Sequence, residues 1–172
     1  MATPTTLPAS FTAGQVLTAA QMNNLRGAFR VLQVVQATKA NVFTTSSATY
    51  VDVTDLSVTI TPSATTNKIL VLMTVQTAAQ TGDAVVRLVR GATAIAAGTG
   101  GSGYNGVGMA SSTYTNQMFT VGTNFLDSPA TTSATTYKVQ ALSNSGITHI
   151  NRRGVDASYG GFSTITVMEI SE

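Results

Sequence analysis

The chain has 172 residues, the length of one domain with room for a short extension, and only 9% of them are charged, against about 25% in an average globular domain. The basic residues are scattered and the net charge is only +2, so neither nucleic acid nor an anionic membrane is indicated as a partner. The absence of Cys excludes disulfides and thiolate metal sites, and no stretch approaches the ~18 apolar residues of a membrane helix.

Residues 1–30 are predicted to form an anchor. Residues 1–10 are rich in Pro and Thr and should lack structure until they dock on a partner. One helix is predicted over 11–32, because Thr18 and Gln21 form a capping-box pattern. Its apolar stripe consists of Met22, Leu25, Phe29 and Leu32. This stripe is too short to stabilise a helix alone, so it packs either on the sheet of its own domain or, as we favour, against symmetry mates in a short coiled-coil neck.

The remaining chain, 31–172, is predicted to be a β-sandwich head domain. Its longest apolar run is 68–75, where β-branched residues and two apolar faces predict a central strand that is covered on both sides. The other expected strands are 31–38, 41–45, 50–53, 56–60, 84–90, 93–96, 115–126, 135–142, 147–151 and 162–170. Strands without intervening helices predict a mainly β, two-sheet antiparallel sandwich and favour a jelly roll.

Residues that could carry catalysis are few and far apart in the sequence. The single histidine, His149, argues against a triad or a His-based metal site within one subunit, and the acidic residues show no glycosidase spacing. The glycine-rich stretch 98–108 lacks the Lys-Ser/Thr ending of a P-loop and is interpreted as a surface loop. No cofactor is predicted. One metal hypothesis remains, in which three copies of His149 meet near a threefold axis.

Two loops are the candidate recognition surface, because loops at the end of a sandwich can vary while the sheets hold them. The candidate binding residues are Tyr104, Asn105, Arg152, Arg153 and Tyr159. The tyrosines offer flat faces to sugar rings, and the arginines can pair with acidic sugars or phosphate. The alternative interpretation of the arginine pair is structural: the arginines pair with Asp156 or with a neighbouring subunit.

Several segments, taken in order, carry a resemblance to one family of proteins. They include LQVVQAT at 32–38, YVDVT at 50–54, LSVTITP at 56–62, NKILV at 67–71, RLVRGATAI at 87–95, FLDSP at 125–129, TYKVQ at 136–140, INR at 150–152 and ITVMEI at 165–170. Together they resemble the β-rich terminal domains of tailed-bacteriophage virion proteins of the tail-fibre, minor-tail and head-fibre kinds. The segment FTAGQVLTAAQMN at 11–23 also resembles a recurring start of phage structural proteins.

This resemblance implies a structural protein on the surface of the virion, a homotrimer that forms a short fibre, spike or decoration. Residues 1–30 would bind other capsid or tail proteins, and the head would be presented outward, where it could adhere to host surface glycan. The resemblance brings no catalytic residues, so no enzyme is expected. The alternative function is a virion enzyme that degrades host glycan, for which only the acidic residues and His149 could carry hydrolysis.

Overall fold

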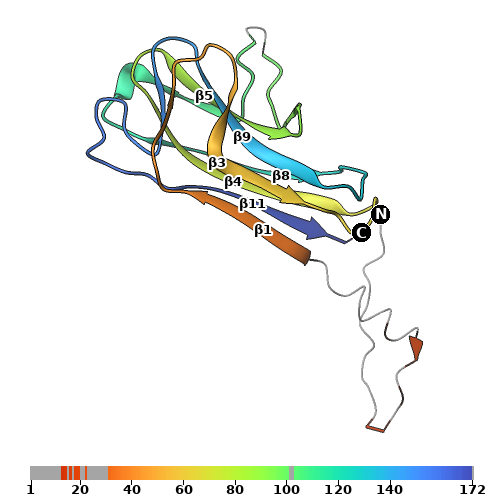
Figure 1. The fold of residues 1–172 in the computed structure, drawn as a ribbon. Helices are drawn as coiled ribbons and strands as arrows, with labels where there is room; N and C mark the ends of the chain where they lie inside the picture. Colours follow the sequence, from red (N-terminus) through yellow and green to blue (C-terminus); the bar gives the residue numbers. More distant parts are fainter. Residues whose placement is uncertain are drawn as a thin grey trace.

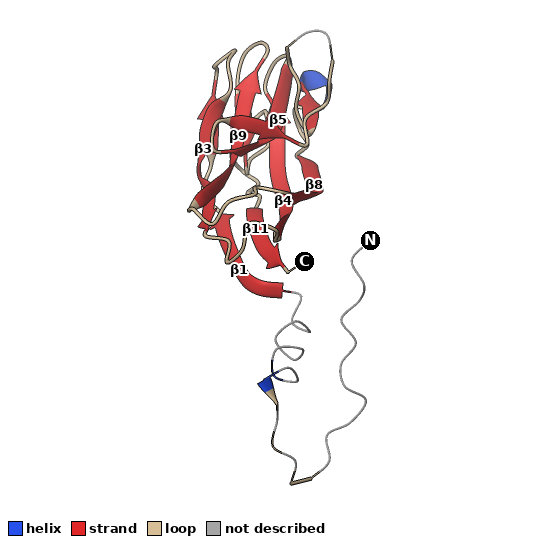
Figure 2. Ribbon diagram, turned by 90° about the vertical axis from the view of Figure 1, so that its right-hand side faces the viewer, coloured by secondary structure: helices blue, strands red, loops and turns tan. Residues whose placement is uncertain are grey.

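The computed structural model describes residues 31–100 and 103–171, together with Ala13, Gly14, Val16, Thr18, Ala19 and Met22. From residue 31 onward the described chain is mainly β, and its strands form two antiparallel sheets (Figures 1 and 2). This architecture confirms the predicted mainly β class with two antiparallel sheets.

Sheet A contains β1 (Val31–Lys39), β2 (Phe43–Thr45), β4 (Lys68–Ala79), β8 (Phe119–Asp127), β10 (Thr148–Ile150) and β11 (Ser163–Ile170). Its strand order is β1-β11-β4-β10-β2, and β8 pairs with β4. Sheet B contains β3 (Val51–Ile60), β5 (Asp83–Arg90), β6 (Thr93–Ile95), β7 (Gly108–Ser111) and β9 (Thr135–Ser143). Its order is β3-β9-β5-β6, with β7 also paired to β5. A 3-10 turn, η1 (Ser112–Tyr114), connects β7 to the segment before β8.

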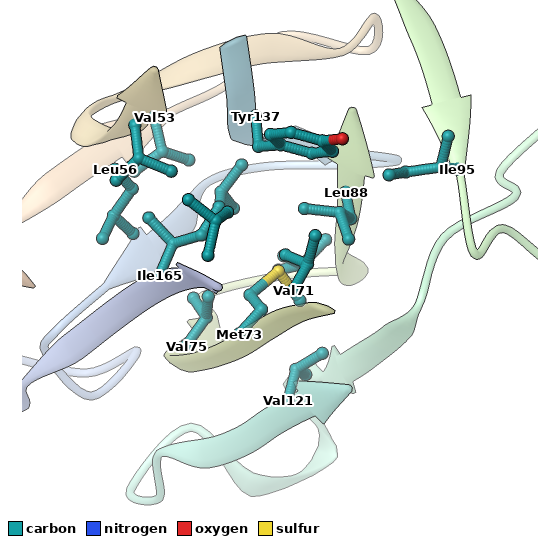
Figure 3. Packing of buried hydrophobic residues seen from close by; sticks show 14 of the residues in the cluster. Val53, Leu56, Val71, Met73, Val75, Leu88, Ile95, Val121, Tyr137 and Ile165 are labelled. Carbon is teal, nitrogen blue, oxygen red and sulfur yellow. The ribbon is translucent and has the colours of Figure 1, made fainter. Parts of the chain in front are cut away.

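The core lies between the two sheets and follows from the alternation of side chains along each strand. Val71, Met73 and Val75 of β4 point to the inner side and join one buried cluster (Figure 3). Leu88 of β5 and Tyr137 of β9 enter the same cluster from sheet B. The apolar residues at every second position of the strands therefore build one main core, and a second, smaller cluster consists of Ala79, Ala84 and Ala110 with Phe119 packed against it.

The apolar run 68–75 lies in the middle of sheet A, as predicted, with β11 on one side and β8 on the other. The prediction that both of its faces are covered is wrong. Val71 is fully buried, whereas Leu72 is 37% exposed and Leu70 is only half-buried. The physical reason is that the described chain supplies a layer for the inner face of sheet A and leaves this part of its outward face open.

The predicted helix over 11–32 is wrong at its C-terminal end, because Leu32 lies in β1. The pattern of β-branched residues there is satisfied by the antiparallel ladder with β11, in which Val31 pairs with Ile170. Consequently the four residues of the predicted oligomerisation stripe cannot share one helix. Met22 is helical, and its N–H donates to the carbonyl oxygen of Thr18 at 3.0 Å. Leu25 and Phe29 lie outside the described residues.

Smaller differences concern turns and edge strands. The expected strands 50–53 and 56–60 form one strand, β3, which is interrupted by a bulge where Asp55 has a φ of 68°. The expected strand 115–126 begins only at Phe119. Strand β7 begins at Gly108, the last residue of the glycine-rich stretch. It was not predicted, because its four residues carry little β pattern.

An ion pair between the buried Asp127 and the partly exposed Arg90 joins the two sheets at the end where β8 and β5 finish. Both carboxylate oxygens of Asp127 accept hydrogen bonds from Arg90 at 2.8 Å, and one of them also accepts from the hydroxyl of Tyr137 at 2.6 Å. Burial and this hydrogen bond raise the pKa of Tyr137 far above its usual range, so the phenol stays protonated. Asp127 is therefore a structural link between the sheets.

Candidate functional site

The candidate site is the loop 151–162 between β10 and β11, called the distal loop below. It lies at the end of the sandwich opposite the pair Val31 and Ile170, where β1 begins and β11 ends (Figure 1). Strand β11 separates the two ends by on the order of 25 Å, given ~3.3 Å per residue. The described head thus has two distinct ends. The distal loop lies at the end opposite Val31, where the chain enters β1.

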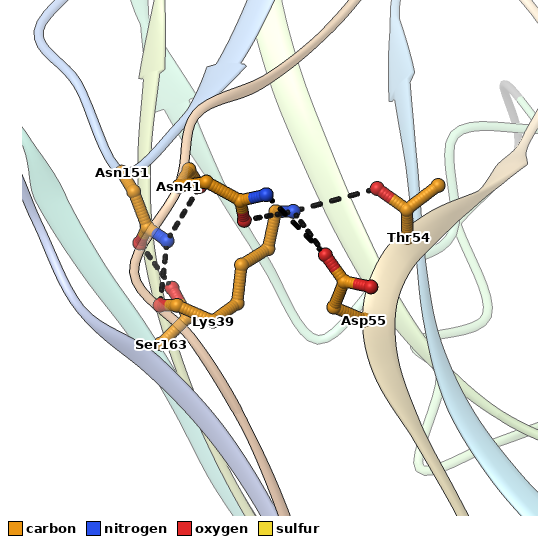
Figure 4. A network of polar contacts seen from close by, with 6 residues as sticks. All are labelled: Lys39, Asn41, Thr54, Asp55, Asn151 and Ser163. Atoms are coloured by element: carbon orange, nitrogen blue, oxygen red, sulfur yellow. Dashed lines mark hydrogen bonds and ion pairs between the residues drawn. The ribbon is translucent and has the colours of Figure 1, made fainter.

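The base of the distal loop is held by Asn151, which is fully buried and adopts a φ of 63°. Asn is one of the few residues that tolerate this left-handed conformation. Its side-chain amide donates to the carbonyl oxygens of Lys39 at 2.8 Å and Asn41 at 3.2 Å, and its side-chain oxygen accepts from Ser163 at 2.6 Å (Figure 4). These contacts fasten both ends of the loop to the β1–β2 connection.

The buried ammonium of Lys39 supports the same region. It donates to the side-chain oxygen of Asn41 at 2.7 Å and lies 3.3 Å from a carboxylate oxygen of Asp55 (Figure 4). A buried lysine is tolerated only when it is paired in this way. The left-handed Asp55 in the bulge of β3 supplies the partner, so the bulge has a structural purpose.

The tip of the distal loop contains a folded-back pair, Arg153 and Asp156. The guanidinium donates two hydrogen bonds to the carboxylate, at 2.7 and 2.6 Å, and its carbon lies 4.5 Å from the ring centre of Tyr159. The hydrogen bonds from Arg153 hold the pKa of the Asp156 carboxyl well below its usual range. The pairing with Asp156 that the structural interpretation expects is therefore present, and a role of Arg153 in binding stays a prediction.

Tyr159 beside this pair is exposed, and two further exposed aromatic side chains belong to the distal loop and to η1. Tyr159 is 61% exposed, and Phe162 at the end of the loop and Tyr114 in η1 are each 54% exposed. The backbone N–H of Val155 donates to the carbonyl oxygen of Thr115, which ties the loop to the segment after η1. Sequence reasoning missed Tyr114 because only the fold brings η1 beside the distal loop, and it missed Phe162 because that residue was assigned to the expected strand 162–170. Flat, exposed rings beside a guanidinium can stack on sugar rings.

Arg152 lies at the edge of the same loop, where it forms an isolated bridge with Gly160 and its side chain donates to the carbonyl oxygen of Arg153. The other two predicted binding residues have different surroundings. The hydroxyl of Tyr50 donates to the backbone oxygen of Asn105 at 2.8 Å, and Tyr104 lines a hollow of about 150 Å³ beside β5 and β7. The structure therefore brings Arg152, Arg153 and Tyr159 together, and it holds Tyr104 and Asn105 through separate contacts.

His149 immediately precedes this region and is only 4% exposed. Neither of its ring nitrogens has a hydrogen-bond partner among the described residues. Burial and the charge of Arg152 lower the pKa of His149 to about 4, so the ring is neutral at pH 7. Since both nitrogens are buried, the hypothesis of a metal bound by three copies of His149 would require this part of the chain to open.

The acidic side chains of the described chain are each held by different donors. Asp52 accepts from Lys138 and Gln140, Asp83 accepts from Asn144, and Glu169 accepts from Ser63, Asn67 and Gln33. Within the ranges that the structure describes, no group of three or more His, Asp or Glu residues could hold a metal ion. This arrangement gives no support to the glycan-degrading alternative.

Neither a scan against protein-family models nor a search of the curated proteins found a match to this chain. Among the described residues, no helix is long and apolar enough to span a membrane. The features that bear on function are therefore the geometry of the distal loop and the resemblance of the strand segments to phage virion proteins.

Proposed function

We propose that this chain is a structural protein of a tailed-bacteriophage virion, a short fibre, spike or decoration that is attached through residues 1–30 and presents its β head outward. The observation that carries this proposal is the arrangement of the two ends of the head. The chain enters the head at Val31, and the exposed aromatic and arginine side chains of the distal loop lie at the opposite end. An attached head with an outward contact surface needs this arrangement.

The composition supports the same function. A surface of threonine, serine and glycine loses little side-chain entropy when subunits pack together, which suits a permanent component of a particle. Jelly-roll connectivity, a helical neck in the N-terminal segment and assembly as a homotrimer are part of this proposal. Host surface glycan is the proposed contact of the distal loop, because exposed aromatic rings can stack on sugar rings and a nearby arginine can pair with acidic sugars.

The attachment part is tested with a truncated chain that begins at Val31. We expect it to keep its β-rich circular dichroism spectrum, because every described ladder of sheets A and B lies at or after residue 31. It should fail to join particles assembled without the full chain, whereas the full chain supplied in the same way should join them. Normal incorporation of the truncated chain would show that residues 1–30 are not the anchor.

The adhesion part is tested separately by replacing Arg152, Arg153 and Tyr159 with Ala on intact particles. We expect adsorption to host cells to fall by about tenfold or more, because the variant loses the flat face of Tyr159 and two charge-assisted donors, and a loss of ~1.4 kcal/mol is already tenfold in affinity. The control is Met109→Ala, which removes an exposed side chain of β7 that is not a candidate binding residue. If the triple variant is folded and incorporated yet adsorbs normally, the head has only a structural role.

A further inference from the structure

The outward face of sheet A carries an unbroken row of apolar side chains across four strands. Val34 of β1 pairs with Met168 of β11, Met168 pairs with Leu70 of β4, and Leu70 pairs with Leu126 of β8. Val34 is 54% exposed and Leu126 is 56% exposed. With ~4.8 Å between neighbouring strands, the row is about 15 Å wide. We call it the apolar row.

The positions around the apolar row are uncharged. Leu72 and Ile170 extend it along β4 and β11, Val31 and Leu32 at the start of β1 are also exposed, and most other outward positions of these four strands are Thr, Gln, Asn and Gly. The only charged side chain on this face of the four strands is Lys68, which lies at its border. Single exposed apolar residues are ordinary on a protein surface, but a contiguous group on a face without charges marks an interaction surface.

We propose that the apolar row is the surface through which copies of this chain associate side by side. The first argument is the sequence of β4, whose run 68–75 has the composition of a strand that is buried on both faces. Within one described chain only the inner face is buried. A second copy placed against Leu70 and Leu72 would supply the missing layer.

The second argument concerns which partner fits. Copies arranged about one symmetry axis turn the same face of each copy towards that axis, so a charge on this face would approach its like, and an uncharged face avoids this cost. The threonines and short amides of this face also lose little entropy on contact, unlike lysine or glutamate. Val31, where residues 1–30 join the head, lies beside Ile170 at the border of the row. Copies that associate here with parallel long axes would therefore bring their anchors together.

This inference supplies the surface for the association that the proposed function requires, but its test needs no virion. The full chain is measured by light scattering up to roughly 100 μM, a range that covers weak as well as tight association. We expect the wild type to be an oligomer and Leu126→Lys to weaken association by about 100-fold or more, because each copy would then bury a charge. Met109→Lys is the control, since Met109 is equally exposed but lies on β7 of sheet B.

A second measurement identifies what covers the row. Because the chain has no Cys, Leu126→Cys and Met109→Cys each introduce a single thiol. We expect labelling by a maleimide at position 126 to slow by about tenfold as protein concentration rises through the association range, and labelling at position 109 to stay constant. Protection at position 126 in a protein that light scattering shows to be monomeric would mean that the chain's own segment covers the row, and it would overturn the proposal.

The remaining outcomes are equally decisive. A monomeric wild type with fast labelling at position 126 leaves the row open and overturns the proposal. An oligomeric wild type whose mass is unchanged by Leu126→Lys places the contact elsewhere and also overturns it. Whether or not the truncated chain joins virions, the mass from light scattering and the rate of thiol labelling stay the same. A failure of the proposed function and a failure of this inference can therefore be told apart.

Discussion

The outward faces of the two sheets differ in chemistry: that of sheet B carries a network of charged and polar side chains, and that of sheet A carries the apolar row. On sheet B, Arg87 lies 3.7 Å from the ring centre of Tyr50 and donates to Gln140, which in turn donates to Asp52. Lys138 completes this network with a 2.7 Å contact to Asp52. On sheet A the corresponding surface has the apolar row and no such charged network. A face whose polar groups satisfy each other is suited to water, and an apolar face without charges is suited to another protein layer.

Both faces depend on the sheets staying packed, so the largest effect should come from the ion pair that joins them. Asp127→Ala leaves the Tyr137 hydroxyl and the Arg90 guanidinium without their buried partner. We expect a loss of about 3–5 kcal/mol in the free energy of unfolding, measured by urea denaturation. The control is Asp52→Ala, which breaks an exposed pair and should cost at most about 1 kcal/mol. Equal effects of the two variants would contradict the assignment of Asp127 as the link.

The next effect concerns His149, the one position where the outward side of sheet A carries a buried ionisable ring. The alternation along β10 places it opposite the core residue Ile150. Its pKa is lowered from 6.5 to about 4, so the unfolded chain binds the proton more readily than the folded one. The stabilisation is therefore complete above pH 6.5 and is lost as the pH falls towards 4, by up to about 3 kcal/mol.

His149→Phe should abolish this part of the pH dependence, measured as unfolding free energy between pH 7 and 4. Glu169 also contributes, because burial raises its pKa but the hydrogen bonds from Asn67, Gln33 and Ser63 outweigh burial and lower it to about 2. Its contribution is present above pH 4.5 and is lost as the pH falls to 2, and it is the same in both proteins. A wild type and variant with parallel pH profiles would show that His149 titrates normally.

A third variant, Arg87→Ala, tests whether the sheet B network serves the single chain. Loss of the stacking on Tyr50 and of the hydrogen bond to Gln140 should cost about 1–2 kcal/mol of unfolding free energy, with no change in the mass of the assembly. Arg87→Lys keeps the charge but not the planar group, and should recover only part of the loss. If Arg87→Ala instead dissociates an oligomer, sheet B rather than sheet A is the contact face.

The smallest effect is expected at Thr74, an exposed outward residue of β4. Thr74→Val keeps the β-branched shape and should change the unfolding free energy by less than about 0.5 kcal/mol. It enlarges the apolar surface by about one methyl group, so association should strengthen roughly two- to fivefold in sedimentation equilibrium. Thr59→Val on the outward side of β3 is the matched control. Weaker association of Thr74→Val would argue against an apolar contact at this face.

The candidate site divides into what local sequence could indicate and what it could not. The polarity of Arg152, Arg153 and Tyr159 beside glycines was readable as a loop, because such residues seldom fit a buried strand. The pairing of Arg153 with Asp156 was one of two open interpretations, since residues three apart can meet only if the loop turns back. The position of Tyr114 at the same end depended on long-range packing and was not predicted, and Phe162 was assigned to the following strand, which begins only at Ser163.

The sequence by itself determined most of the strands and the inner face of each sheet, because alternation and turn residues act over a few neighbours. Hence the run 68–75 could be recognised as central before any pairing was known. Only the tertiary structure decided that Val34, Met168, Leu70 and Leu126 form one row, since strand pairing joins segments far apart in the chain. It also decided that this row remains open in the single chain, because covering a face requires a further layer and not a local pattern.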